Sequence, residues 1–154
     1  DLVATYRKIH LFGFDTGEAA TLTAGSDVVV VDTPLGRTAL ATCYDLRFPE
    51  LFRAHIDNGA TSVLLTSGWP SLRIARWNLL AAARACENQM WVIGCNEVGH
   101  HGGQDLGGHS LIADPWGEVI ATAGTTEETL YADIDPALPA QVRASFPVLP
   151  DRRL

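Results

Sequence analysis

The chain has 154 residues and a mass of 16.6 kDa, and 47% of its residues are hydrophobic while 19% are charged. This size and composition are typical of one globular domain and argue against a disordered chain or a membrane partner, because no apolar run approaches the roughly 20 residues of a spanning helix. Eighteen acidic residues against eleven basic ones give a formal net charge of −7, which argues against a nucleic-acid partner.

In chain order, alternating or β-branched patterns predict strands in residues 6–12, 27–32, 37–42, 61–66, 90–95, 109–113, 118–122 and 129–134. A turn at residues 33–36 joins the second and third of these into a β-hairpin that ends at Cys43. Another turn, at residues 114–117, joins two later strands. The Gly-rich stretch 99–108, with its paired histidines, predicts a flexible surface loop rather than a metal site.

Three helices are predicted among these strands. The first has Pro49 in its first turn and stops at residues 58–59, the second is the Ala-, Leu- and Arg-rich stretch 71–88, and the third is 136–145. The long second helix lies between two strands, which is the pattern of a parallel crossover. The mixed order of elements predicts a single α/β domain in which antiparallel hairpins are added to parallel crossovers.

The three cysteines, Cys43, Cys86 and Cys95, form an odd set without CxxC or Cys/His ligand spacing. This pattern argues against a disulfide framework or a zinc site and fits the reducing cytosol, so a cytoplasmic protein is expected. Cys86 lies within the Ala-rich helix and Cys95 within a strand, and both are interpreted as buried small residues.

Cys43 differs from the other two cysteines in its position, because it lies at the end of a strand and just before a helix. The exposed amides of a helix start favour negative charge, so they stabilise a thiolate there. The alternative interpretation of Cys43 is a buried small hydrophobic residue.

Lys8 taken alone is interpreted as a solvated surface lysine. Its interpretation changes because the segment around Lys8 and the later segment that begins at Cys43 together resemble a known family. Residues 6–12 (YRKIHLF) and 43–50 (CYDLRFPE) resemble the lysine and nucleophile motifs of the nitrilase superfamily of carbon–nitrogen hydrolases. Further matches follow at Glu18, residues 67–70, Trp77, residues 83–85 and 87–88, Asn96, and residues 108–110 and 114–117. The amidase-like branch with the omega-amidases looks closest. The resemblance implies an αββα four-layer sandwich, with this chain covering its C-terminal part.

The resemblance also implies roles in amide hydrolysis. Cys43 is the nucleophile that forms a thioester acyl-enzyme, and Lys8 stabilises the tetrahedral oxyanion together with the backbone N–H of Tyr44. Glu18 matches an auxiliary glutamate that positions the lysine; without the resemblance it would be an exposed residue on a polar turn. No cofactor is implied.

Two further residues are candidates for substrate binding. Family members that act on carboxylated substrates place an arginine at the position of Arg47, where a guanidinium can hold a carboxylate in bidentate fashion. The alternative for Arg47 is a structural ion pair with Asp45 or Glu50. Trp69 lines the pocket or belongs to the core, since an aromatic residue at a strand exit can do both.

The general base of the resembled family is a glutamate that precedes the lysine motif, and no glutamate precedes Lys8 here. We therefore expect residues 1–154 to be a carbon–nitrogen hydrolase domain without its N-terminal portion, which a missing segment or a complementing chain would supply. The expected reaction cleaves the C–N bond of a small, carboxylate-bearing amide and releases ammonia or an amine. Family members commonly pair, so a homodimer is expected.

Two other classes of function remain open. The chain could be a catalytically silent interaction module, because half a sandwich exposes sheet edges and apolar faces that need a partner. It could instead be a papain-like hydrolase that pairs Cys43 with His109.

Overall fold

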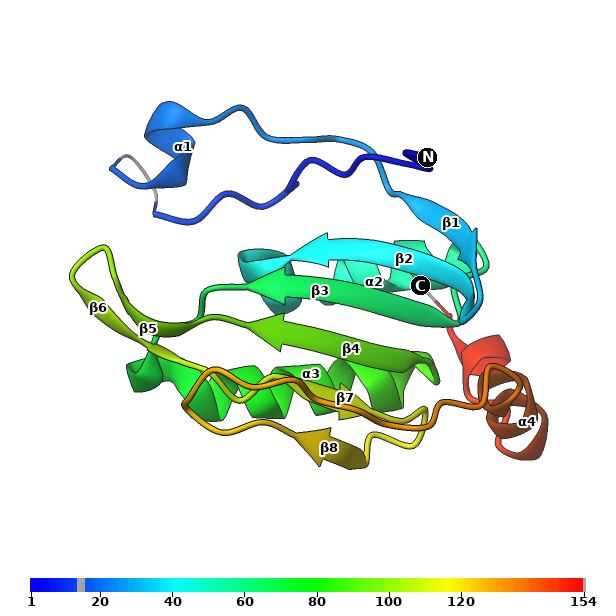
Figure 1. Cartoon of the computed structure of the whole chain (residues 1–154). Helices are drawn as coiled ribbons and strands as arrows, with labels where there is room; N and C mark the ends of the chain where they lie inside the picture. Colours follow the sequence, from blue (N-terminus) through cyan, green and yellow to red (C-terminus); the bar gives the residue numbers. More distant parts are fainter. Residues whose placement is uncertain (14–15, 154) are drawn as a thin grey trace.

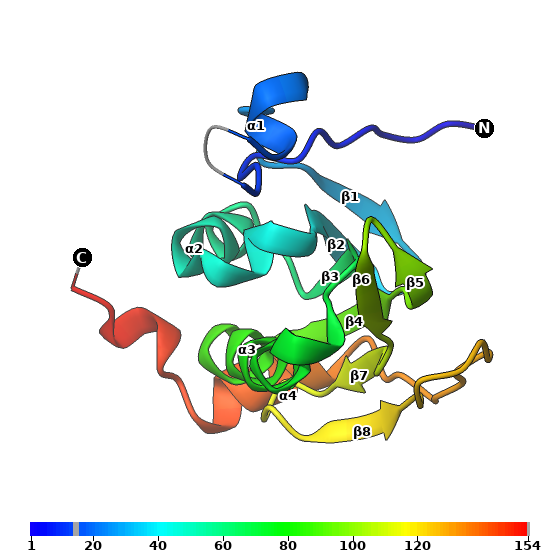
Figure 2. The same cartoon turned by 90° about the vertical axis from the view of Figure 1, so that its left-hand side faces the viewer.

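The computed structural model describes residues 1–13 and 16–153. Its main element is a mixed sheet in the order β1-β2-β3-β4-β7-β8, formed by Val30–Thr33, Gly36–Thr42, Ser62–Ser67, Trp91–Asn96, Leu111–Ala113 and Val119–Thr122. Helices α2 (Pro49–Asp57) and α3 (Ile74–Asn88) lie side by side on one face of this sheet (Figures 1 and 2). The α/β class predicted from the sequence is confirmed. The described residues supply one sheet and one helical layer of the four layers that the resemblance implies.

The three central strands of the sheet end at the same edge. Strands β2, β3 and β4 are parallel neighbours, with α2 and α3 as the crossovers between them, as predicted for the second. Parallel strands share the direction in which they end, so Cys43, Gly68 and Glu97 leave the sheet at the same edge. The predicted hairpin of β1 and β2 is confirmed, with Thr33 opposite Gly36, and Gly36 adopts φ +89° in the turn.

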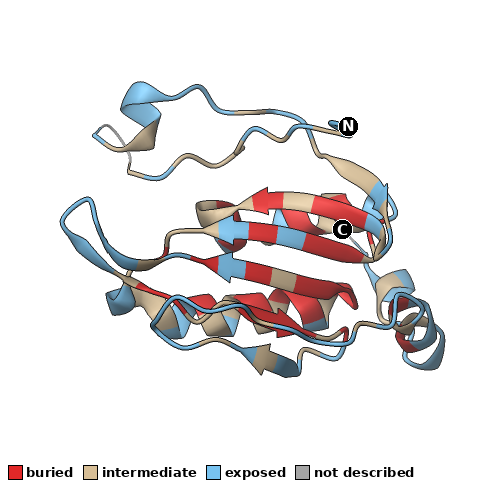
Figure 3. Ribbon diagram, viewed as in Figure 1, coloured by how far each residue is buried: buried red, intermediate tan, exposed pale blue. Residues whose placement is uncertain are grey.

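The hydrophobic core lies between the sheet and the two helices (Figure 3). Trp77 of α3 and Phe52 of α2 are fully buried there. The Trp77 ring reaches β4 only because residue 94 is glycine: a Cβ at Gly94 would lie 2.8 Å from Cζ2 of Trp77. Arg84 of α3 is also buried, and its Nε donates to the carbonyl of Leu46, which ties α3 to the turn after β2.

Smaller elements complete the chain. They are the short helix α1 (Glu18–Thr21), the 3-10 turns η1 (Cys43–Arg47), η2 (Ser71–Arg73) and η3 (Leu149–Asp151), the strands β5 (Val98–His101) and β6 (Gln104–Gly107), and helix α4 (Leu138–Ser145). The predicted third helix is confirmed with a later start. None of the helices among residues 1–13 and 16–153 is long and apolar enough to cross a membrane.

The prediction of a flexible loop over residues 99–108 is wrong, because this stretch forms the β5–β6 hairpin. Val98 pairs with Gly107 and His101 with Gln104. Gly102 and Gly103 form the two-residue turn with φ of +58° and +76°, which is the backbone that a hairpin turn requires. The glycines therefore close a hairpin instead of loosening a loop.

Two predicted strands are absent from the described structure. Residues 129–134 form no strand in the part of the chain that is described, and β8 is the last strand on that side of the sheet. Residues 6–12 are also not a strand. Their backbone donors go to side chains instead, since the N–H of Ile9 donates to the Tyr6 hydroxyl and that of His10 to the Asp45 carboxylate.

The interpretation of Cys86 and Cys95 as buried residues is wrong, because both are exposed. Cys95 on β4 pairs in register with the exposed Thr66 on β3, whereas its neighbours Gly94 and Asn96 are buried. Alternation along β4 therefore places Cys95 on the sheet face opposite α2 and α3, where no other described layer covers it.

His55 of α2 predicts a pH-dependent stability. Its side chain is fully buried against Phe52, with ring centroids 5.7 Å apart, and neither ring nitrogen has a hydrogen-bond partner in the described structure. Burial lowers the pKa of His55 to about 4. The unfolded chain, with an ordinary histidine pKa near 6.5, therefore binds this proton more readily than the folded one between about pH 4 and 6.5. Stability from this group is complete above that window and decreases by up to about 3 kcal/mol as the pH falls through it.

Urea unfolding at pH 4.5 and pH 7 measures this effect in the wild type and in His55→Leu. Carboxylates also titrate in this range, so the difference between the two proteins isolates the histidine. The wild type is expected to lose more stability on acidification than the variant. Equal losses would show that His55 does not resist protonation in the fold.

Candidate active site

The site begins at the sharp turn that follows β2. Cys43 is the first residue of η1 and has φ +50°, a left-handed conformation that is unfavourable for a side-chain-bearing residue. The carboxylate of Asp45 closes this turn by accepting the backbone N–H of Thr42 at 2.9 Å. Tyr44 lies in the first turn of η1, where backbone N–H groups have no acceptor within the helix. The turn thus leaves Cys43 partly exposed, beside backbone N–H groups that have no partner within the turn.

Asp45 also holds the segment that carries Lys8. Its side chain is fully buried and accepts the Tyr6 hydroxyl at 2.7 Å, the backbone N–H of His10 at 2.9 Å and the His10 ring Nδ1 at 2.8 Å. The His10 ring stacks on Phe48, with centroids 3.7 Å apart. Burial and the hydrogen bond to Asp45 raise the pKa of Tyr6 above its ordinary value, so the hydroxyl keeps the proton that it donates. One carboxylate therefore joins the two segments expected to carry the chemistry.

The structure places Lys8 and Glu18 in direct contact. The Lys8 ammonium lies 2.5 Å from Oε2 of Glu18, and the same oxygen accepts the backbone N–H of Phe12 at 2.8 Å. The Lys8 side chain is only 11% exposed, so its ammonium is held in a fixed position instead of moving through solvent. An auxiliary glutamate that positions the lysine, the role expected for Glu18, requires such a direct contact with the Lys8 ammonium.

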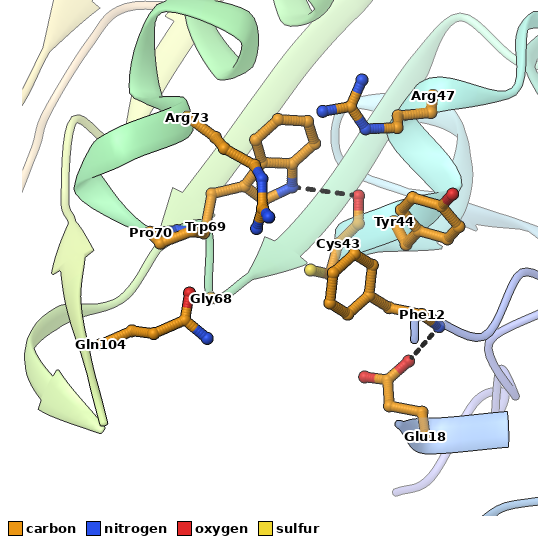
Figure 4. A pocket seen from close by; sticks show the side chains of 10 residues that line it. All are labelled: Phe12, Glu18, Cys43, Tyr44, Arg47, Gly68, Trp69, Pro70, Arg73 and Gln104. Carbon is orange, nitrogen blue, oxygen red and sulfur yellow. Dashed lines mark hydrogen bonds between the residues drawn. The ribbon is translucent and has the colours of Figure 1, made fainter. Parts of the chain in front are cut away.

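Two adjoining hollows meet at Cys43. The first, which we call the tryptophan pocket, is drawn in Figure 4 and is lined by Phe12, Glu18, Cys43, Tyr44, Arg47, Gly68, Trp69, Pro70, Arg73 and Gln104. The second, the lysine pocket, is lined by Lys8, Glu18, Thr42, Cys43, Thr66, Ser67, Gly68, Glu97, His101, Gly102, Gln104 and Leu106. Every site residue predicted from the sequence therefore borders one of the two hollows, with Cys43 and Glu18 shared.

Trp69 and Arg47 line the tryptophan pocket together. Trp69 fulfils both interpretations, because it is 3% exposed within the core and its Nε1 donates to the Cys43 carbonyl at 3.3 Å. Arg47 places its guanidinium carbon 4.9 Å from the centroid of the Trp69 ring. Arg47 makes no ion pair within the described part of the chain, and Asp45 is occupied by other donors, so the structural ion pair with Asp45 or Glu50 is not formed. The guanidinium is available at the pocket.

Several residues of this site were given no role from the sequence, although the resemblance includes Phe12 and Asn96 among its matches. Phe12, Arg73 and Gln104 line the tryptophan pocket, and Asn96 supports it: Oδ1 of Asn96 accepts the Trp69 N–H at 2.6 Å, and Nδ2 donates to the Gly108 carbonyl at 2.6 Å. The position of Asn96 at a strand exit was a usable signal. No sequence signal pointed to Gln104, because the stretch around it was taken for a loop.

The pairing of Cys43 with His109 finds no support in the geometry. His109 lines neither pocket; its Nδ1 contacts the Gly107 carbonyl at 2.7 Å, and its own carbonyl accepts Nε1 of Trp77. Among the described residues, no group of three or more His, Cys, Asp or Glu side chains could hold a metal ion. The chemistry that the arrangement can support is that of a thiol, an ammonium and backbone amides.

Comparison with known proteins gives a consistent result. Residues 1–144 match the family model of carbon-nitrogen hydrolases. A 2-oxoglutaramate amidase of Paenarthrobacter nicotinovorans is 44% identical over 156 residues, which cover 99% of this chain and 53% of that protein. The chain therefore spans about half the length of the curated relatives it matches.

Two solved structures extend the similarity to the fold. Saccharomyces cerevisiae Nit3, a member of the nitrilase superfamily, is 34% identical and superposes with a TM-score of 0.88 over 100% of this chain and 56% of Nit3. A mutant of the amidase from Nesterenkonia sp. AN1 is 28% identical, with a TM-score of 0.80 over 96% of this chain and 57% of that one. That structure shows the result of Michael addition of acrylamide at the active site cysteine of the amidase.

Proposed function

This chain belongs to the carbon-nitrogen hydrolase family, and we propose that it carries the nucleophile of an amidase acting on a small, carboxylate-bearing amide. One observation carries the proposal. Cys43, on its strained turn, lines the same pocket as the Lys8–Glu18 ion pair. The active site cysteine of the Nesterenkonia amidase supports the assignment of the nucleophile. The similarity to a 2-oxoglutaramate amidase supports an amide that also bears a carboxylate as the class of substrate.

The proposed reaction proceeds through a thioester. The Cys43 sulfur attacks the carbonyl carbon, and the electron pair of the C=O bond moves to oxygen, where Lys8 and the N–H of Tyr44 stabilise the negative charge. Collapse of this intermediate breaks the C–N bond, and the nitrogen leaves as ammonia or an amine after it receives the proton from the thiol. Water then attacks the thioester, releases the carboxylic acid and restores the thiol.

The proton transfers in this scheme need a base that is free to accept. Of the carboxylates that line the two pockets, Glu18 is engaged by Lys8 and Phe12, while Glu97 lines the lysine pocket, as Cys43 does. The resembled family takes its base from neither position but from a glutamate before the lysine motif. We propose that the general base is a glutamate outside residues 1–154, on a further segment or a complementing chain, and that the assembled protein is a cytoplasmic homodimer. Arg47 is proposed to bind the substrate carboxylate, and Trp69 to form the pocket wall beside it.

Competition among the three thiols tests the nucleophile. Limiting iodoacetamide is expected to alkylate Cys43 at least about tenfold faster than Cys86 or Cys95, because the proposed function makes Cys43 the nucleophile of the site. Exposure alone predicts the reverse order, since Cys86 and Cys95 are exposed and Cys43 is only partly so. Mass spectrometry of peptides reads the order directly in one sample.

Turnover is measured in parallel on the full-length protein, as ammonia released from 2-oxoglutaramate or glutaramate. These substrates are also expected to slow the alkylation of Cys43 but not that of Cys86. If Cys43 reacts more slowly than the exposed thiols and no ammonia is released, the chain is a catalytically silent interaction module, and the proposed function is wrong.

A further inference from the structure

The tryptophan pocket contains a second arginine, Arg73, besides the Arg47 proposed to bind the substrate carboxylate. Its ionisable lining includes Glu18, Arg47 and Arg73, and Glu18 is already matched by the Lys8 ammonium at 2.5 Å. Neither arginine side chain forms an ion pair or a hydrogen bond with another residue of the described structure. Two unmatched cations thus border one hollow in a chain whose net charge is −7, which indicates that they attract an anionic ligand.

Each guanidinium is held by an aromatic ring. Arg47 lies 4.9 Å from the centroid of Trp69, and Arg73 lies 5.6 Å from that of Phe12. Stacking on a ring fixes the plane of a guanidinium while its N–H edges remain free to donate. Each arginine is thus oriented before a ligand arrives, so less conformational entropy is lost when one binds.

Arg73 reaches the pocket from a different direction than Arg47. It ends η2 and precedes α3, whereas Arg47 ends η1, so the two come from turns that follow different parallel strands. In Figure 4 the side chain of Arg73 extends into the pocket toward Phe12, while that of Arg47 lies along the Trp69 ring. The η2 turn is itself fixed, because the hydroxyl of Ser71 donates to the carbonyl of Asp105 in the β5–β6 hairpin.

We propose that Arg73 is a specificity-determining residue that, with Arg47, forms a two-arginine subsite for the carboxylate at the end of the substrate remote from its amide. This inference rests on the proposed function, because the amide must lie at Cys43 while the carboxylate lies at the arginines. The proposed function already takes a carboxylate-bearing amide, and Arg73 adds a second set of N–H donors for its carboxylate. Planar guanidinium groups match a carboxylate by paired N–H donors.

The test compares two amides in the full-length protein. Glutaramate carries the remote carboxylate and butyramide lacks it. In Arg73→Gln, the ratio of kcat/KM for glutaramate to that for butyramide is expected to fall by about 10- to 100-fold, which is the usual effect of losing a charge-assisted hydrogen bond. Arg73→Lys keeps the charge without the paired donors and is expected to lose less. The matched control is Arg76→Gln, which removes an exposed arginine from α3 that lines neither pocket.

A second measurement needs no turnover. Glutarate is expected to protect Cys43 from iodoacetamide, and in Arg73→Gln about tenfold more glutarate is needed for the same protection. An unchanged substrate ratio, or unchanged protection, in Arg73→Gln overturns the role of Arg73 and leaves the amidase intact. A wild-type protein that hydrolyses neither amide and leaves Cys43 unreactive overturns the proposed function instead, so the two failures are distinguishable.

Discussion

Replacement of Cys43 by alanine is expected to lower the rate of amide hydrolysis by about 10⁴-fold or more, because no other side chain at the site can form the covalent intermediate. Serine at this position keeps an oxygen in place of the sulfur but is a far weaker nucleophile without a dedicated base, so Cys43→Ser is expected to be nearly as inactive. Ammonia release from glutaramate by the full-length protein measures both variants.

Folding must be separated from chemistry in this experiment. Alanine and serine both retain the Cβ of Cys43, so the cost of φ +50° stays the same, and urea unfolding is expected to change little. Cys95→Ala removes a thiol from the open face of the sheet and serves as the matched control. Retention of turnover in a folded Cys43→Ala protein would exclude the thioester route.

Asp45→Asn is expected to reduce the free energy of unfolding by about 3–5 kcal/mol, the usual range when one partner of a buried charged network is removed. Oδ2 of Asp45 accepts both the Tyr6 hydroxyl and the Thr42 N–H. An amide nitrogen in that place presents hydrogens to two donors, while a nitrogen at the other position opposes the backbone N–H of His10. No orientation of asparagine satisfies all four partners.

Urea unfolding measures the loss of stability, and hydrogen exchange at the His10 amide reports whether the Lys8 segment has come loose. The control is Asp57→Asn, whose exposed carboxylate pairs with Arg152 at 2.6 Å, and its cost is expected to stay below about 1 kcal/mol. Similar losses in the two variants would show that Asp45 is not the residue that joins the two segments.

Short-range signals in the sequence predicted most of the sheet and helices. The turn before Gly36, the proline at the start of α2 and the Ala-rich stretch of α3 act through neighbours a few residues away, and all three predictions agree with the structure. The hairpin at residues 98–107 was also encoded locally, in the Gly102–Gly103 pair, but these glycines were interpreted as part of a flexible loop instead of a hairpin turn.

Features that depend on distant residues escaped the sequence. Tyr6 and His10 meet Asp45 across 39 and 35 positions, so the spacing within the CYDLRFPE motif shows nothing of this network. Arg73 reaches Phe12 only after the sheet has brought η2 beside the first segment. The resemblance grouped Cys43, Lys8 and Glu18 in one predicted site, and the structure brings all three to the lysine pocket. An ordered set of motifs carries such long-range information.

The attachment of Lys8 has a consequence for how the protein responds to heat. No described residue before β1 is buried, and this part of the chain is held largely by donors to Asp45 and by a few contacts such as the N–H of Gly25 with the Lys8 carbonyl. Segments with so little buried surface open well below the temperature at which the whole fold melts. In residues 1–154 taken alone, moderate warming is therefore expected to separate the Lys8 segment from Cys43 while the sheet, its helices and the turn at Cys43 remain folded. The first effect of heat on this chain is thus expected to be local and reversible on cooling.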